Sequence, residues 1–480
     1  MSLTDAQWLA WLKQPDKQPT AAIQINYEDD GGTAGILYIS NFGYIDPYDV
    51  DAPNYTASIV NDVILRQDEK LSVLESIDVK IDNASLFDYY FIGFSITVYY
   101  GDRSWAFSSF RQIYTGKIAD FARLPNNYAR ILTDQNLLDV YLNQTVDISD
   151  YSYSSYANLD YPFGLGTGVF NMQPIRRSST AYRMYWIEPF LSDLVVRKNG
   201  VTQTLTTHYT RSYYSGFTGV DISFVTAPGT NDVITIDLGG EYGSASGNFN
   251  IVGNSAARIV SNAIPHTFAN VIRDSDVGYV WYEPEPFRKY AELCMRSCGA
   301  FPRMNASGEV EAYTPNTLPD TVTFRNVESP EIIQKSMQIV DISEVWKRYT
   351  FGWKKNFYPQ RRGLDSSVSE ANVRKFSQDY SYSLVTRTAD EYPNAISVDA
   401  ESIITDSNDM IAVQEFEFGY IGNGRTTIEY EVVYTGIYDD IGDSVKITTS
   451  DFGLSTGDYF TVIQNDINLN TGVCTQRGRT

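Results

Sequence analysis

Residues 437–472 read IYDDIGDSVKITTSDFGLSTGDYFTVIQNDINLNTG. Apolar and polar side chains alternate in two runs of this stretch, and glycines separate the runs, which is typical of strand, turn and strand. No residue in it ordinarily carries out chemistry. Residues 411–434 alternate in the same way, so the sequence predicts a β-barrel domain over 320–480.

The first third of the chain repeats this pattern. Alternation is clearest in SIDVKID and ITVYY, and the turn sequences DDGG, YGDR and LPNN punctuate it. A half-buried sheet with one wet face has this pattern. The sequence therefore predicts a first small β-barrel over 20–150, with strands at 21–28, 35–45, 74–83, 94–102, 110–121 and 128–135.

The middle of the chain is less regular. Residues 146–180 have no period and predict a long connection, and an inserted β-module follows at about 181–250 with a hairpin turn at Asn199-Gly200. The connection and module together form a segment at 151–250. A mixed helix and strand segment follows at 251–319, and its helix at about 285–298 begins near Pro286 and ends before Gly299.

The N-terminal arm, residues 1–19, contains a short amphipathic helix over 3–13, with Ser2 as N-cap and Asp5 three positions on. Two tryptophans on so short a helix have to be buried. They pack either against the chain's own first domain or against a neighbouring subunit. The candidate partner-docking residues are Trp8, Leu9, Trp11 and Leu12.

Composition sets the fold class. The 480 residues are 43% hydrophobic and include 36 Tyr and 24 Phe, which favours pleated, half-buried surfaces. We expect a mainly β, multidomain chain with two small β-barrel domains, an inserted β-module and a few short helices. Three cysteines give no disulfide framework and favour a reducing compartment during folding. The sequence shows neither a signal peptide nor a membrane span.

The net charge of −22 argues against specific nucleic-acid binding, because the summed field repels phosphate. The acidic excess is explained either by simple solubility or by a surface that DNA passes without adhering.

The sequence shows no evident group of catalytic or metal-binding residues. His208 and His266 are the only histidines, which argues against a histidine metal site and against a catalytic Ser-His triad. Cys294 and Cys298 are interpreted as core residues. The runs GLGTG (164–168) and GNGRT (422–426) are interpreted as turns, and so are the aspartates of DPYDVDAP, Asp46, Asp49 and Asp51. We therefore predict no catalytic residue, no cofactor and no metal.

Several segments resemble the hub proteins of tailed-phage tails and baseplates. These are YDDIGDSVKITTSDFGLSTGDYFTVIQND (438–466), the helix, turn and strand of 286–314, VWKRYTFGWKKNFYP (345–359), LESIDVKIDNAS (74–85) and YTGKIADF (114–121). The resemblance covers about 20–145 and 250–475, whereas the module at 181–250 departs from the minimal hub.

The resemblance implies a non-enzymatic structural protein of the virion. In that family a homotrimer presents two barrels per chain as a pseudo-sixfold ring. It implies a tail-tip location, assembly in the host cytoplasm, and contacts with the tail tube or distal tail ring, the tape-measure protein and tip fibres or receptor-binding proteins.

Two other functions stay open from the sequence. The tyrosine-rich stretch at 150–164 and the β-module suit a receptor- or glycan-binding tail protein. The 59 acidic residues leave room for the paired carboxylates of a polysaccharide-degrading enzyme.

Overall fold

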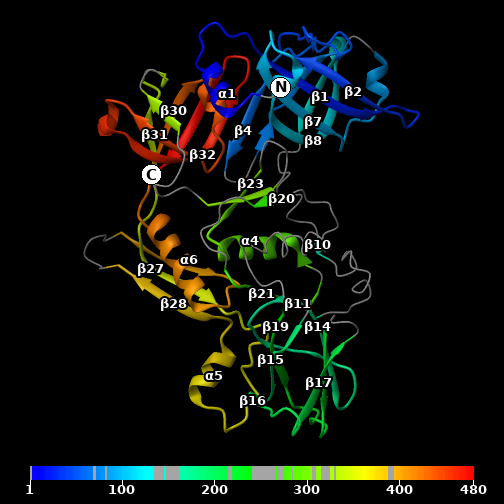
Figure 1. The fold of residues 1–480 in the computed structure, drawn as a ribbon, viewed down its shortest axis with the longest axis vertical. Helices are drawn as coiled ribbons and strands as arrows, with labels where there is room; N and C mark the ends of the chain where they lie inside the picture. The colour runs from blue at the N-terminus through cyan, green and yellow to red at the C-terminus, as the bar shows by residue number, and fades with distance from the viewer. Residues whose placement is uncertain are drawn as a thin grey trace.

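The computed structural model describes residues 3–68, 72–81, 84–133, 145–146, 162–186, 189–214, 219–240, 266–268, 275–283, 285–304, 310–314, 325–328, 331–333, 335–387 and 394–480. The chain is mainly β and has several separate sheets, which confirms the expected fold class. Figure 1 shows two β-units side by side in the upper part, one from each end of the chain. The middle of the chain forms the lower part.

The first unit is a closed barrel. Its strands run in the order β3-β2-β1-β7-β8-β9-β6. Closure comes from the residues after β3, because Val60 N donates to Asp78 O and Lys80 N to Ser58 O. Its elements are β1 (Pro19–Glu28), β2 (Ala34–Ser40), β3 (Thr56–Ala57), β6 (Ile77–Lys80), η1 (Ala84–Asp88), β7 (Ser95–Asp102), η2 (Phe107–Ser109), β8 (Arg111–Leu124), η3 (Pro125–Asn127) and β9 (Tyr128–Thr133).

The second unit is a sheet in the order β25-β31-β32-β33-β30-β26. Residues shortly after β25 return to β30, because Ile332 bridges Val432 and Ile333 N donates to Glu431 O at 2.8 Å. The sheet therefore closes on itself through these residues, as expected for a barrel. Its elements are β25 (Arg325–Glu328), β26 (Gln338–Ile342), β30 (Thr426–Val433), η5 (Thr435–Tyr438), β31 (Ser444–Thr448), η6 (Asp451–Thr456), β32 (Asp458–Asn468) and β33 (Val473–Arg479).

Two strands cross from the first segment into the second sheet. Strand β4 (Ile64–Asp68) pairs antiparallel with β32, and β5 (Ser72–Leu74) pairs with β4. The expected boundary of 20–150 does not separate these strands from the C-terminal unit. Residues 64–68 were not among the expected strands, and a strand's pattern does not encode which edge it joins.

Helix α1 (Asp5–Leu12) lies between the two units (Figure 1). Its N-cap is Thr4 rather than Ser2, and Gln7 rather than Asp5 completes the capping box. The Thr4 hydroxyl accepts from Gln7 N at 3.3 Å, and Gln7 Oε1 accepts from Thr4 N at 2.9 Å. Gln7 stands at the third helical position from Thr4, which gives the reciprocal geometry that the box requires.

One hydrophobic core spans helix α1 and both units. It contains Trp8 from the helix, Ile23 and Tyr100 from the barrel, and Tyr430 and Phe460 from the second sheet. Because the apolar faces of the two units are buried in one cluster, the upper part behaves as a single packed body.

The lower part contains a β-sandwich. One sheet has the order β17-β18-β14-β11-β21 with β13 beside β14, and the other is β12-β19-β15-β16. A core formed by both sheets lies between them. The strands are β11 (Phe163–Gly166), β12 (Val169–Met172), β13 (Ile175–Arg176), β14 (Ala181–Trp186), β15 (Pro189–Lys198), β16 (Val201–Thr202), β17 (Tyr209–Tyr214), β18 (Gly219–Phe224), β19 (Ile234–Gly240) and β21 (Gly278–Trp281).

The hairpin at Asn199-Gly200 is confirmed. Both residues have positive φ, 52° and 81°, and Lys198 pairs with Val201 across the turn. The expected connection at 146–180 was wrong over its described part, because β11, β12 and β13 lie there. These strands have four residues or fewer, so they leave little periodic signal.

The predicted helix near 285–298 is confirmed as α4 (Phe287–Ser297), with Gly299 at φ 66° after its end. It follows β22 (Glu285–Pro286), which pairs with β10 (Thr145–Val146). After α4 come β23 (Phe301–Met304) and β24 (Val310–Tyr313), and β20 (His266–Phe268) joins β24. Helix α5 (Glu370–Ser377) lies at the bottom of Figure 1.

A three-stranded sheet, β28-β27-β29, lies beside helix α6. Its strands are β27 (Trp346–Trp353), β28 (Ser381–Thr386) and β29 (Ile396–Glu401), and α6 is Ser407–Tyr420. The expected strand pattern at 411–434 was wrong for its first half, which belongs to α6. The alternation in EFEF imitates a strand, but the buried Met410, Val413, Glu417 and Tyr420 follow helical spacing.

Candidate functional site

The predicted docking residues of the N-terminal helix are brought together inside this chain. Trp8 is 1% exposed, Trp11 5% and Leu12 1%, whereas Leu9 is half-buried. The Trp8 and Trp11 rings lie 5.0 Å apart and pack against Tyr100. Of the two alternatives, the structure places these side chains against their own chain. Docking of a partner at this helix stays a prediction, and only Leu9 keeps much surface for it.

Polar contacts fix the helix between the two units. The Trp11 indole donates to Asp102 Oδ2 at 3.0 Å, and Gln18 N donates to the same oxygen at 2.8 Å. On the other side, Lys13 Nζ lies 2.8 Å from Glu331 Oε1. The Lys17 ammonium lies 3.7 Å from the centre of the Tyr434 ring. The N-terminal arm therefore acts as a clasp between the barrel and the second sheet.

Asp102 gives the clasp a testable pH dependence. Burial raises the pKa of Asp102, but hydrogen bonds from Ser104, Gln18 and Trp11 outweigh burial and hold this pKa below its ordinary value. A lowered folded-state pKa contributes stability above the unfolded value of about 4, and the contribution is lost as the pH falls through the folded pKa. We expect Asp102→Asn to lower the free energy of unfolding by about 1–3 kcal/mol at pH 7.

Urea titrations at several pH values measure this effect. The difference between Asp102→Asn and the unsubstituted chain should shrink once the pH falls below about 4. Asp16→Asn, which changes an exposed carboxylate on the same arm, is the matched control. A deficit that stays constant down to pH 2 would contradict the assignment.

Exposed apolar side chains gather at the edge of the second sheet. Strand β26 is exposed along its whole length, with Ile339 50%, Val340 37% and Ile342 65% exposed. It pairs with β30 on one side, and the described residues give it no strand on the other. Native proteins rarely leave such an edge uncovered.

The barrel also presents exposed apolar residues. The loop between β2 and β3 exposes Ile45, Tyr48 and Val50, and the buried Asp46 holds this loop by accepting from Tyr48 N at 2.8 Å and from Phe107 N at 2.7 Å. Further apolar side chains lie at Ile36, Tyr90 and Ile92. Single exposed apolar residues are common, but several on a rigid scaffold indicate docking surfaces.

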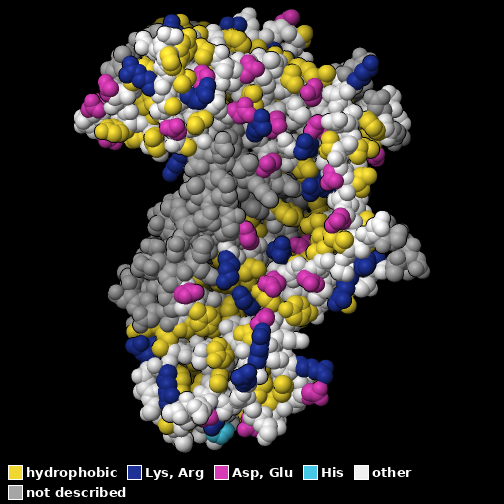
Figure 2. All heavy atoms as spheres, turned by 180° about the vertical axis from the view of Figure 1, so that it is seen from behind, with side chains coloured by type: hydrophobic (Ala, Val, Ile, Leu, Met, Phe, Trp, Pro, Cys, Tyr) yellow, Lys and Arg dark blue, Asp and Glu magenta, His cyan; other side chains and the backbone are white. Residues whose placement is uncertain are grey.

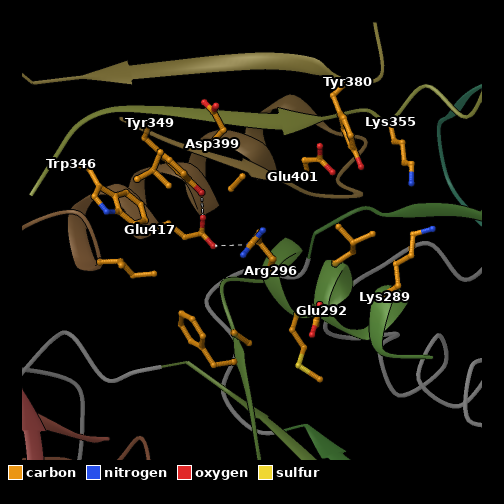
Figure 3. A pocket seen from close by; sticks show the side chains of 17 residues that line it. Lys289, Glu292, Arg296, Trp346, Tyr349, Lys355, Tyr380, Asp399, Glu401 and Glu417 are labelled. Atoms are coloured by element: carbon orange, nitrogen blue, oxygen red, sulfur yellow. Dashed lines mark hydrogen bonds and ion pairs between the residues drawn. The ribbon is translucent and has the colours of Figure 1, made fainter. Parts of the chain in front are cut away.

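The lower part contains a cleft of about 740 Å³ between α4, β29 and α6 (Figure 3). Helix α4 contributes Lys289, Glu292 and Arg296, which are exposed on one helix face. The opposite wall is formed by Asp399 and Glu401 of β29. Apolar and aromatic side chains complete the lining: Leu293, Met295, Ala300, Phe301, Trp346, Tyr349, Tyr380, Val398, Ala400 and Ile421.

A buried carboxylate lines this cleft. Glu417 is 6% exposed, its Oε2 accepts a hydrogen bond from the Tyr349 hydroxyl, and its Oε1 lies 3.8 Å from Arg296 Nε (Figure 3). Burial raises the pKa of Glu417, although the Tyr349 hydroxyl and the Arg296 charge oppose this shift. Its negative charge is therefore only partly compensated by the surrounding chain.

The cysteines, histidines and aspartates considered in the sequence as possible reactive or metal-binding residues do not form a common site. Cys294 and Cys298 form no disulfide and are fully buried, and burial raises the pKa of the Cys294 thiol. His208 Nδ1 accepts from Thr204 N at 2.9 Å within a turn. Asp46 was expected in a solvated turn, yet it is buried because it organises the loop. Among the described residues, no group of three or more His, Cys, Asp or Glu could hold a metal ion.

No helix in the described ranges has the length and apolar character to span a bilayer.

Sequence reasoning missed the cleft and the exposed edge of β26. The cleft combines residues from 289 to 421, and no motif links them. The helical spacing of α6 was the one available signal for Glu417. Strand β26 was not among the predicted strands, and the exposure of both its faces was not foreseen.

These observations define a mainly β, multidomain chain whose prominent features are a core shared by two β-units, exposed apolar side chains and a cleft in the lower part. No protein-family model matches its sequence, and no curated protein matches it.

Among solved structures, the chain is similar to the 43 kDa tail protein of prophage MuSo2 from Shewanella oneidensis, with 9% identity, 96% and 98% of the two chains covered and a TM-score of 0.45. It is similar to a tail protein from Neisseria meningitidis, with 9% identity, 96% and 97% coverage and a TM-score of 0.43. For the prophage tail protein gp18 from Listeria monocytogenes, the identity is 6%, the coverage 96% and 94%, and the TM-score 0.44. At these values the likeness assigns no function to this chain.

Proposed function

We propose that this chain is a structural protein of a phage tail, the hub at the tail tip, and that it acts by assembly rather than by catalysis. Three copies would form a ring with six β-units, a pseudo-sixfold adaptor. The observation that carries the proposal is the upper part of the fold, where two β-units from the two ends of one chain share a single core. A chain that carries two such units can match a sixfold ring with threefold symmetry.

The arrangement of strands supports specific subunit contacts. Along the hydrogen-bonded path β5-β4-β32-β33-β30-β26, strand β26 stands at the opposite end from β4 and β5. Its exposed apolar residues would face the barrel of the next copy, where Ile36, Tyr90 and Ile92 offer apolar surface. Permanent interfaces of this kind commonly bury more than about 2,000 Å².

The remaining parts of the proposal concern partners and DNA. The ring would contact the tail tube or distal tail ring, the tape-measure protein, and tip fibres or receptor-binding proteins. It would assemble in the host cytoplasm and remain in the virion. The net charge of −22 suits a channel that DNA passes without adhering. Figure 2 shows both signs of charge interspersed on one outer face, so the acidic excess is not concentrated there.

Sedimentation velocity of the purified chain tests the ring. We expect a trimer at micromolar concentration, and we expect Ile342→Lys on the exposed edge of β26 to weaken it at least tenfold. The matched control is Val373→Lys on α5, which changes a residue 36% exposed in the lower part and should leave the trimer intact. Gold-labelled chain in micrographs of assembled tails should mark the tip.

Two results would overturn the proposal. One is a monomer at all concentrations, alone and with tail components. The other is label along the tail shaft or on the capsid. Reducing ends released from host polysaccharide by the purified chain would favour the enzymatic alternative instead.

A further inference from the structure

Strand β29 has an open edge that faces the cleft. It pairs in parallel with β27, and the described residues give it no partner on its other side. Ile396 N donates to Val345 O at 2.9 Å, and Ser402 N donates to Gly352 O at 2.8 Å. Backbone groups of successive residues point to opposite sides of a strand. Those of Ser397, Asp399 and Glu401 are therefore directed away from β27.

The space beside this edge fits an extended chain. Helix α4 forms the opposite wall, and the cleft continues past Leu293 and Arg296 to Arg348, Thr350 and Tyr382 on the open face of the sheet. A groove with a free strand edge on one side and a helix on the other is a known way of binding peptides as an added strand. Backbone hydrogen bonds then supply affinity, and side-chain pockets supply specificity.

The charged residues beside the open edge of β29 indicate what kind of peptide would bind there. Asp399 and Glu401 are exposed on β29, and the buried Glu417 has one hydrogen bond from Tyr349 and a long ion pair, 3.8 Å, with Arg296. The basic groups Lys289 and Arg296 lie on the opposite wall. A cation arriving along β29 would compensate the buried carboxylate. The aromatic side chains of Trp346 and Tyr349, with ring centres 4.9 Å apart, line the same end of the cleft.

We propose that the cleft between α4 and β29 binds an extended peptide segment of a partner protein, which adds to β29 as a strand and places a lysine or arginine side chain beside Glu417. This site is separate from the proposed subunit contacts of β26. Whether this peptide site exists does not depend on whether the chain forms a trimer.

Fluorescence anisotropy with the full chain tests the proposal. The probe is a short labelled peptide of alternating threonine and valine with one central arginine, and its matched control carries glutamate instead. We expect saturable binding of the arginine peptide and at least tenfold weaker binding of the glutamate peptide. Glu417→Gln should weaken the arginine peptide about tenfold, as expected for the loss of a charge-assisted hydrogen bond. Glu415→Gln, an exposed position on the same helix, should leave binding unchanged.

Hydrogen exchange supplies a second readout that needs no substitution. The peptide should slow exchange of the Ser397, Asp399 and Glu401 amides, and a peptide with methylated backbone nitrogens should not. Equal affinity for the two peptides, no saturable binding, or binding without protection of 396–401 would overturn the proposal. Binding of neutral oligosaccharide in place of the peptide at this cleft would do the same.

Discussion

Replacing Asp439 by alanine is expected to lower the free energy of unfolding by about 3–5 kcal/mol, because it leaves a buried guanidinium without its main partner. Arg325 Nε donates to Asp439 Oδ1 at 2.6 Å, and a second guanidinium nitrogen contacts Oδ2. The two side chains are 3% and 1% exposed, so water cannot replace the carboxylate. Burial lowers the pKa of Arg325, but the Asp439 charge outweighs burial and keeps the pKa above its usual range.

Urea unfolding followed by circular dichroism measures the effect. Glu331→Gln is the matched control, because Glu331 contacts the same guanidinium at 3.0 Å from a more exposed position. Its expected cost is about 1 kcal/mol. If the free energy of unfolding of Asp439→Ala lay within about 1 kcal/mol of that of the unsubstituted chain, the Arg325–Asp439 pair would not stabilise the second sheet.

Trp8→Ala is expected to cost about 3–5 kcal/mol, the usual range for removing a fully buried aromatic side chain. Trp8 packs on Trp11, Tyr100 and Trp105, and the Arg111 guanidinium lies 5.2 Å from its ring centre. Because this side chain belongs to the core that joins both units, its loss should also loosen their attachment. Thermal unfolding of the variant should separate into more than one transition.

The neighbouring Leu9 provides the comparison for this experiment. Leu9→Ala changes a half-buried residue of the same helix and should cost about 1 kcal/mol or less. Limited proteolysis should cut Trp8→Ala within residues 13–18 faster than either Leu9→Ala or the unsubstituted chain. Equal cutting rates in the three proteins would contradict the role of α1 as a clasp.

The local elements of the fold were largely readable from the sequence. Alternation located the barrel strands, Asn199-Gly200 specified its hairpin through two positive φ angles, and Gly299 marked the end of α4. These features depend on neighbouring residues only. Helix α6 was misread because EFEF alternates, although Met410, Val413 and Glu417 repeat at helical intervals.

Long-range partners could not be read in the same way. Strand β4 was not among the expected strands, and its place beside β32 depends on edges that form elsewhere in the chain. The cleft was hidden for the same reason, since Arg296, Tyr349 and Glu417 meet through packing between separate elements. Burial of Trp8 was expected, whereas its location in this chain or a neighbour required the structure.

The pairing of β4 with β32 has a consequence for biosynthesis. Asp62 and Asn468, which flank this pairing and share a 2.9 Å hydrogen bond, are 406 residues apart. At about 5–20 residues per second, a ribosome needs roughly 20–80 s to cover that interval. During this time the nascent chain contains strand β4 without its hydrogen-bonding partner β32. The chain is therefore most prone to misassociation and to binding by chaperones before translation ends.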